Sequence, residues 1–207
     1  MRISHIIPSF YDYFNDINEV AFSLVDGINA LGQESKPTTL QYGPPSKEMQ
    51  ERIQEVAPTT APIYTGEVKF EEVINEFAGY DIIHLHSPFL GAAGKLLDWK
   101  KRNPNHPFLV TYYRDVVFTD MIALGLRWYD AYYLPKIFAA ADVVTCFSAD
   151  DFFRSSGARY LADKDKLFAL GGAFKTIHLT EDTYDVKLIN KDEVIQNLIS
   201  VYEELIN

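Results

Sequence analysis

Short apolar runs alternate with helical patterns along most of this chain, and this alternation limits the fold more than any other feature. The runs resemble β-strands and lie at 2–7, 38–42, 81–86, 108–113 and 142–147, with a weaker one at 62–64. The helical segments between them lie at 17–31, 46–56, 69–78, 90–102, 119–140 and 149–156. Such alternation is typical of βαβ units. The sequence therefore predicts the α/β class, as a single Rossmann-like domain with a mainly parallel sheet and helices on both faces.

Apolar patterning indicates which parts of these segments are buried. The runs at 81–86, 108–113 and 142–147 are apolar on both faces, as central strands of a parallel sheet must be when helices cover each side. Helix 17–31 should pack on the sheet by a stripe at three-to-four spacing, and Gly32 then fits a C-cap. The stripe consists of Val20, Leu24, Ile28 and Leu31.

Composition bounds the classes of function. In 207 residues with 47% hydrophobic content there is enough apolar material for one compact core. The formal net charge of −10 disfavours nucleic acid as a partner, because phosphate binding needs a positive face. The single cysteine, Cys146, lies in an apolar run and reads as a buried small hydrophobe. No long apolar segment and no signal peptide are apparent, so we expect a cytoplasmic protein.

Polar and aromatic residues follow the predicted strands, at the edge where open α/β sheets bind ligands. Side chains of this kind suit hydroxyl groups and a phosphate. The candidate substrate-binding residues are Asp12, Asn15, His86, Ser87, Tyr113, Arg114, Asp115 and Ser148.

Two histidines in the run 81–86 raise the question of a metal. His84 and His86 share one face of the strand, because side chains alternate with period two. A metal needs a third and usually a fourth ligand, and no HExxH, cysteine pair or paired carboxylate has matching spacing. We therefore predict no metal. His84 is expected to be buried and hydrogen-bonded, whereas ligand contact and a structural role remain equally open for His86.

The other candidates also have structural interpretations. Arg114 and Asp115 could pair with each other or cap a helix, and Ser148 before "ADDF" fits an N-cap. No G-x-S-x-G elbow, dinucleotide-binding loop or P-loop is present. The sequence accordingly implies no cofactor.

Basic and aromatic residues mix in two segments, 94–104 and 125–138. Helices of this composition can lie on anionic membranes or meet lipid-linked substrates. The simpler interpretation is a solvated basic face for the first segment and core packing of the aromatic residues for the second. The second segment contains Trp128, Tyr129, Tyr132, Tyr133 and Phe138.

Several blocks, taken in order, resemble the N-terminal half of the family 4 glycosyltransferases of the GT-B fold. They are "MRISHIIPSF", "YDIIHLHSPFLGAAGKLL", "HPFLVTYYRD", "YYLPKIFAAADVVTCFSADDF" and "KLFALGGAF", and they span about residues 1–175. The closing helix is similar to the family's last helix, which returns from the C-terminal domain to the N-terminal one. The resemblance implies a glycosyltransferase N-terminal-like domain at 1–175, a linker at 176–190 in place of the nucleotide-sugar-binding domain, and a helix at 191–207 that docks on the same domain.

Some family motifs differ in this chain. The family's Gly-Gly loop after the first strand reads "FNDIN" at 14–18, and Tyr113 occupies the position of the histidine that contacts the transferred sugar. His86 and Ser148 lie in blocks that match.

The resemblance implies two functions. In one, the chain is the acceptor-side half of a hexosyltransferase in carbohydrate biosynthesis, and another chain or domain binds the nucleotide-sugar donor. In the other, it is an inactive, degenerate glycosyltransferase that acts as a binding or partner subunit, or an engineered single-domain form. The implied partners are a donor-binding chain or a second copy at the open cleft face, a sugar or lipid-linked acceptor, and the inner face of a membrane through peripheral contact.

Overall fold

The computed structural model describes residues 1–8, 11–40, 46–60, 63–64, 69–115, 121–178 and 184–207. Its main sheet has seven strands in the order β3-β2-β1-β4-β5-β6-β7, and every neighbouring pair is parallel. The strands are β1 (Arg2–Ile7), β2 (Glu34–Thr39), β3 (Ile63–Tyr64), β4 (Ile82–Ser87), β5 (Phe108–Tyr112), β6 (Val143–Cys146) and β7 (Leu167–Ala169). This architecture confirms the predicted α/β fold class.

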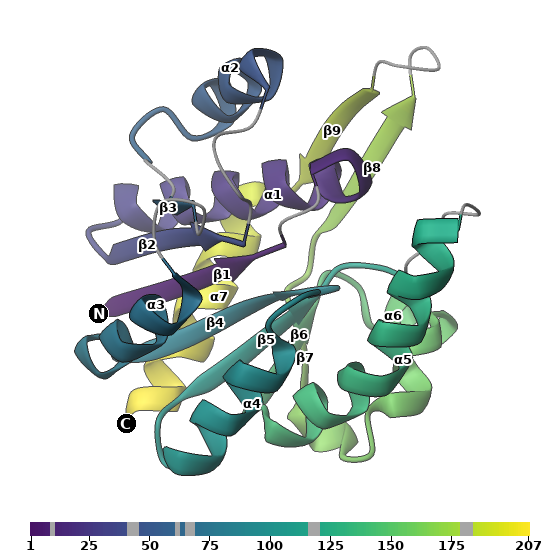
Figure 1. The fold of residues 1–207 in the computed structure, drawn as a ribbon. Helices are drawn as coiled ribbons and strands as arrows, with labels where there is room; N and C mark the ends of the chain where they lie inside the picture. The colour runs from purple at the N-terminus through teal and green to yellow at the C-terminus, as the bar shows by residue number, and fades with distance from the viewer. Residues whose placement is uncertain (9–10, 41–45, 61–62, 65–68, 116–120, 179–183) are drawn as a thin grey trace.

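Helices cover both faces of the sheet (Figure 1). They are α1 (Tyr11–Ala30), α2 (Lys47–Val56), α3 (Phe70–Glu76), α4 (Ala93–Arg102), α5 (Met121–Ala140), α6 (Ala149–Arg154) and α7 (Lys191–Ile206). One apolar cluster joins β1 to α1 and α7, and a second joins β4, β5 and β6 to α3, α4 and α5. Central strand β4 is buried along its whole length, so its polar residues His84, His86 and Ser87 lie inside together with its apolar ones.

Helix α1 packs on the sheet by most of the predicted stripe. Val20, Leu24 and Ile28 are buried, but Leu31 is 48% exposed because the helix ends at Ala30. Gly32 follows with a φ of 84°, the left-handed conformation that favours glycine after a helix. The prediction that Leu31 packs on the sheet was therefore wrong.

Two further segments differ from the sequence-based boundaries. Strand β2 lies at 34–39, earlier than the predicted run at 38–42, because it pairs with β1 over its full length. The range expected to be a linker holds most of an antiparallel hairpin, β8 (Ala173–His178) and β9 (Tyr184–Ile189). Helix α7 follows and buries Val194, Leu198 and Tyr202.

The aromatic residues of α5 do not all pack in the core as predicted. Phe138 is buried and Tyr129 is half-buried, but Trp128 and Tyr132 are largely exposed, because they lie on the side of the helix that faces away from the sheet. Among the described residues, none of the helices combines the length and apolar character that crossing a bilayer requires.

Candidate functional site

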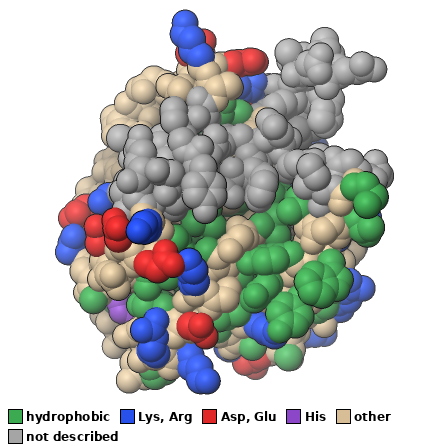
Figure 2. All heavy atoms as spheres, viewed as in Figure 1, with side chains coloured by type: hydrophobic (Ala, Val, Ile, Leu, Met, Phe, Trp, Pro, Cys, Tyr) green, Lys and Arg blue, Asp and Glu red, His purple; other side chains and the backbone are tan. Residues whose placement is uncertain are grey.

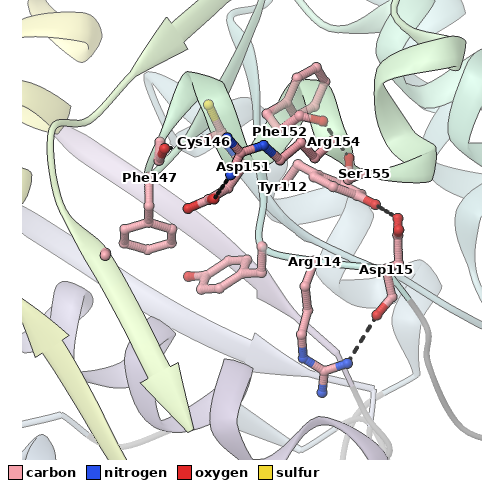
Figure 3. A pocket seen from close by; sticks show the side chains of 12 residues that line it. Tyr112, Arg114, Asp115, Cys146, Phe147, Asp151, Phe152, Arg154 and Ser155 are labelled. Carbon is pink, nitrogen blue, oxygen red and sulfur yellow. Dashed lines mark hydrogen bonds and ion pairs between the residues drawn. The ribbon is translucent and has the colours of Figure 1, made fainter.

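A pocket of about 420 Å³ opens where β5 and β6 end, at the edge of the sheet where ligands bind in folds of this kind (Figure 3). The segment after β5 supplies one wall, and α6 with the residues around it supplies the other. The pocket is lined by Tyr112, Tyr113, Arg114, Asp115, Cys146, Phe147, Ser148, Asp151, Phe152, Arg154, Ser155 and Ala173.

An ion pair fixes Arg114 at the side of this pocket. Its Nε and Nη2 donate to the two carboxylate oxygens of Asp16 in α1, each at 2.9 Å. Both side chains are largely buried, and a bidentate pair of this geometry is stronger than a surface ion pair. Arg114 also donates to the backbone oxygen of Asp115 at 3.0 Å. The guanidinium therefore connects the start of α1 to the end of β5.

Asp115 is held by several donors rather than by the Arg114 side chain. Its carboxylate accepts hydrogen bonds from the Tyr112 hydroxyl and from the backbone N–H and hydroxyl of Ser156. Burial alone would raise the pKa of Asp115, but these hydrogen bonds outweigh burial and lower it. Asp115 is therefore ionised at neutral pH and shapes the pocket wall.

Ser148 has the capping role that the sequence allowed. It is the N-cap of α6, and its hydroxyl accepts a hydrogen bond from the backbone N–H of Asp151. Cys146 is buried as predicted, and burial raises the pKa of its thiol to about 12. A thiol with that pKa stays protonated, so Cys146 is no nucleophile near neutral pH.

Three buried histidines form a hydrogen-bonded network with neighbouring hydroxyl groups, one of which belongs to the pocket residue Tyr113. One chain starts at the Tyr113 hydroxyl, which lies 2.7 Å from His86 Nδ1. His86 Nε2 lies 3.0 Å from His5 Nδ1, and His5 Nε2 lies 3.2 Å from the Ser35 hydroxyl. Tyr113 thus both lines the pocket and belongs to a polar chain through the core.

His84 belongs to a second branch of this network. Its Nδ1 lies 2.6 Å from the Tyr202 hydroxyl of α7 and its Nε2 lies 2.7 Å from the Thr111 hydroxyl. This arrangement confirms that His84 is a buried, hydrogen-bonded histidine. Burial lowers the pKa of all three histidines, for His5 to about 3, so the network is neutral at physiological pH.

The three histidines also meet the first requirement for a metal site, since one nitrogen from each lies within 4.8 Å of the others. The strand register brings His5 opposite His84, which sequence spacing did not reveal. However, both ring nitrogens of each of these three histidines already have a hydrogen-bond partner in the protein. The rings of His84 and His86 are stacked, with an interplanar angle of 27°. This geometry favours a structural network over a metal centre.

The structure brings together half of the candidate site residues. Tyr113, Arg114, Asp115 and Ser148 all line the pocket.

The remaining candidates lie elsewhere. His86 and Ser87 are fully buried outside the lining, and His86 uses both ring nitrogens within the protein. Asn15 lies near the start of α1, and the side chain of Asp12 is outside the described part. Among the described residues, the Oδ1 of Asn15 and the hydroxyl of Ser87 are buried without a hydrogen-bond partner, which marks them for bound water or a ligand.

Sequence reasoning missed Asp16, Tyr112 and His5. Asp16 stands beside the predicted Asn15, and its only sequence signal is a carboxylate at the start of a helix that follows a strand. Tyr112 reads as a core residue because it lies inside the strand. His5 gave one signal, a histidine in the apolar run "RISHII".

Comparison with known proteins gives likeness at the level of fold. No family model and no curated protein matches this chain. A solved alpha-glucosyltransferase in complex with UDP and a 13-mer DNA containing a HMU base superposes with a TM-score of 0.54 at 11% identity, over 82% of this chain and 41% of that one. Another, in complex with UDP, superposes with a TM-score of 0.50 at 11% identity, over 90% of this chain and 42% of that one. The chain thus spans less than half the length of these enzymes, and it has a glycosyltransferase-like α/β fold.

Proposed function

We propose that this chain is the acceptor-side half of a sugar transferase, with the nucleotide-sugar donor bound by another chain or domain. The observation that carries the proposal is the pocket at the ends of β5 and β6, in a fold that is similar to part of an α-glucosyltransferase. The resemblance of the sequence to the N-terminal half of the family 4 glycosyltransferases supports the same assignment.

The charges of the pocket suit a neutral ligand that carries hydroxyl groups. Its two arginines are both matched by aspartates, since Arg114 pairs with Asp16 and Arg154 lies 4.0 Å from Asp151. Stabilising a leaving diphosphate requires cationic or N–H donors directed at the developing charge. Aromatic rings with a few polar groups are instead typical of sites that bind sugars and similar molecules.

A second candidate function, a binding subunit without catalysis, is favoured by the state of Tyr113. Burial raises the pKa of Tyr113 well above 10, and its hydroxyl is directed at His86. A tyrosine in that state cannot take a proton from an acceptor at neutral pH. If transfer occurs, the base is another group, supplied by the partner or by the substrate complex.

The acceptor can be a free sugar, a lipid-linked sugar or a modified nucleic acid. The net charge of −10 speaks against nucleic acid, yet a solved structure of similar fold holds DNA. Charge therefore does not exclude this acceptor class, and the experiment includes it.

The test is calorimetric titration of the chain with methyl glycosides, UDP, UDP-glucose and a DNA duplex that contains hydroxymethyluracil. It is done with the chain alone and with any chain that co-purifies. Two variants are compared. Arg154→Ala changes an exposed residue of the pocket rim, and Arg159→Ala is the matched control outside the lining.

We expect the chain to bind a glycoside or the duplex. Arg154→Ala should weaken this binding about tenfold, because it removes one charged hydrogen bond to the ligand, and Arg159→Ala should leave the binding unchanged. Donor binding and turnover should need the partner. Turnover by the chain alone would overturn the acceptor-side assignment. Acceptor binding without turnover, even with the partner, would assign the binding subunit, and absence of any binding would refute both functions.

A further inference from the structure

Helix α5 is apolar on two opposite sides. Its inner side packs Leu126, Leu134, Ile137 and Phe138 in the core. Its outer side carries a row of large apolar side chains, and none of the described residues buries them. Their exposed fractions are 83% for Met121, 62% for Leu124, 72% for Trp128 and 50% for Tyr132. A row of large apolar side chains on a helix is typical of a buried face, so something else should cover this outer side.

The row is continuous and one-sided. Its members recur at three-to-four spacing, which places them on one helical face over about 17 Å. Trp128 and Tyr132 stack, with ring centroids 5.9 Å apart and an interplanar angle of 7°. Figure 2 shows hydrophobic side chains gathered over α4 and α5, with Lys and Arg side chains beside them.

The exposed charges of α5 are basic, although the chain as a whole is acidic. With 3.6 residues per turn, Arg127 lies about 100° to one side of Trp128 and Lys136 about 80° to the other. Both are exposed, and Lys136 Nζ lies 3.1 Å from the centroid of the Tyr132 ring. The acidic residue of the helix, Asp130, is largely buried on the inner side. The apolar row is therefore flanked on both sides by positive charge.

This charge pattern distinguishes the possible occupants of the face. A second copy would bring the two basic margins together, and that contact is repulsive. An anionic lipid surface complements the margins, and Trp and Tyr favour the interface between headgroups and acyl chains.

We propose that α5 is a docking surface for an anionic lipid bilayer. Met121, Leu124 and Trp128 enter the headgroup region, and Arg127 and Lys136 face the acidic headgroups. Helices of this kind lie in the plane of the interface with their basic residues at the margins. The proposal does not depend on the proposed function, because it uses no residue of the pocket.

The test is co-sedimentation of the chain with vesicles of phosphatidylcholine, and with vesicles of phosphatidylcholine and phosphatidylglycerol in equal parts. We expect the chain to bind the anionic vesicles at least tenfold more strongly than the phosphatidylcholine vesicles. Binding to the anionic vesicles should weaken as salt is added. Fluorescence gives a second readout. Of the two tryptophans, Trp99 is buried, so a blue shift of emission and protection from acrylamide on binding would report Trp128.

Matched variants assign the effect to this face. Trp128→Ser should weaken binding about tenfold and Lys136→Gln about fivefold. Leu31→Ser and Lys47→Gln change an exposed apolar and an exposed basic residue elsewhere, and should leave binding unchanged. Thermal melts should be alike for all four variants, because the side chains are exposed.

Three outcomes would overturn the proposal. The first is equal binding, or none, to both vesicle types. The second is binding that Trp128→Ser leaves intact. The third is a dimer in solution that Trp128→Ser dissociates, which would assign the face to a second copy.

Discussion

Acidification from about pH 7.5 to about pH 5.5 should destabilise the fold by about 2 kcal/mol, because protons bind to the unfolded chain at sites that the folded chain keeps neutral. The sites are His5, His84 and His86, which are fully buried and whose pKa burial lowers below the ordinary 6.5. The unfolded chain binds more protons below pH 6.5, so stability falls as the pH falls. For His5 this continues down to its folded pKa of about 3.

The magnitude follows from linkage. Each histidine that is neutral in the folded chain and titrates at 6.5 in the unfolded chain lowers the free energy of unfolding by about 1.4 kcal/mol over this pH range. Three such histidines lower it by about 4 kcal/mol. His106 acts in the same direction, since burial also lowers its pKa.

Asp130 opposes the histidines. Burial, and then the nearby Asp115 charge, raises the pKa of Asp130 from 3.8 to about 7. The folded chain therefore holds a proton on Asp130 that the unfolded chain releases between these two pKa values. This contributes about 2 kcal/mol of stability on acidification, which leaves a net loss of about 2 kcal/mol.

The assay is urea denaturation at the two pH values, followed by tryptophan fluorescence. Asp130→Asn removes the opposing group with little change in shape, so the pH dependence should grow from about 2 to about 4 kcal/mol. His5→Gln should instead reduce it by about 1.4 kcal/mol. A wild-type change below about 1 kcal/mol, or no increase in Asp130→Asn, would refute the reasoning.

Three further perturbations have defined outcomes. Tyr202→Phe removes the hydroxyl that pairs with His84 Nδ1 and should lower the free energy of unfolding, measured in urea, by about 1–3 kcal/mol. An unchanged free energy of unfolding would mean that water replaces the hydroxyl. Asp16→Asn breaks the bidentate pair with Arg114 and should cost about 3 kcal/mol or more, with Asp98→Asn as an exposed control; equal costs would contradict a buried pair. Cys146, buried and with its pKa raised to about 12, should resist iodoacetamide in the native state and react in urea, and fast native labelling would disprove its burial.

The sequence predicted the main sheet well because its signals are local. The run 108–113 is largely apolar on both faces because a central strand is covered by helices on each side, and this can be read without knowing the neighbouring strands. Where neighbours matter, prediction was weaker. The boundaries of β2 follow from pairing with β1, and the outer face of α5 has the composition of a core although no described residue covers it.

The candidate site shows the same division between local and non-local information. Four of the candidates each follow a strand, namely Tyr113, Arg114, Asp115 and Ser148. Because the carboxyl ends of all strands in a parallel sheet lie at one edge, the fold class alone was enough to predict that these residues lie together.

The histidine network needed the strand order. His5 meets His84 and His86 only because β1 lies beside β4 in the register Ile3↔Ile82, and a shift of one residue would turn His5 to the other face. Tyr202 joins from the far end of the chain because α7 returns to the face that α1 covers. A network assembled from several distant segments leaves no spacing pattern in any one of them. Its energetic signature, protons excluded from three histidines, can nevertheless be measured directly.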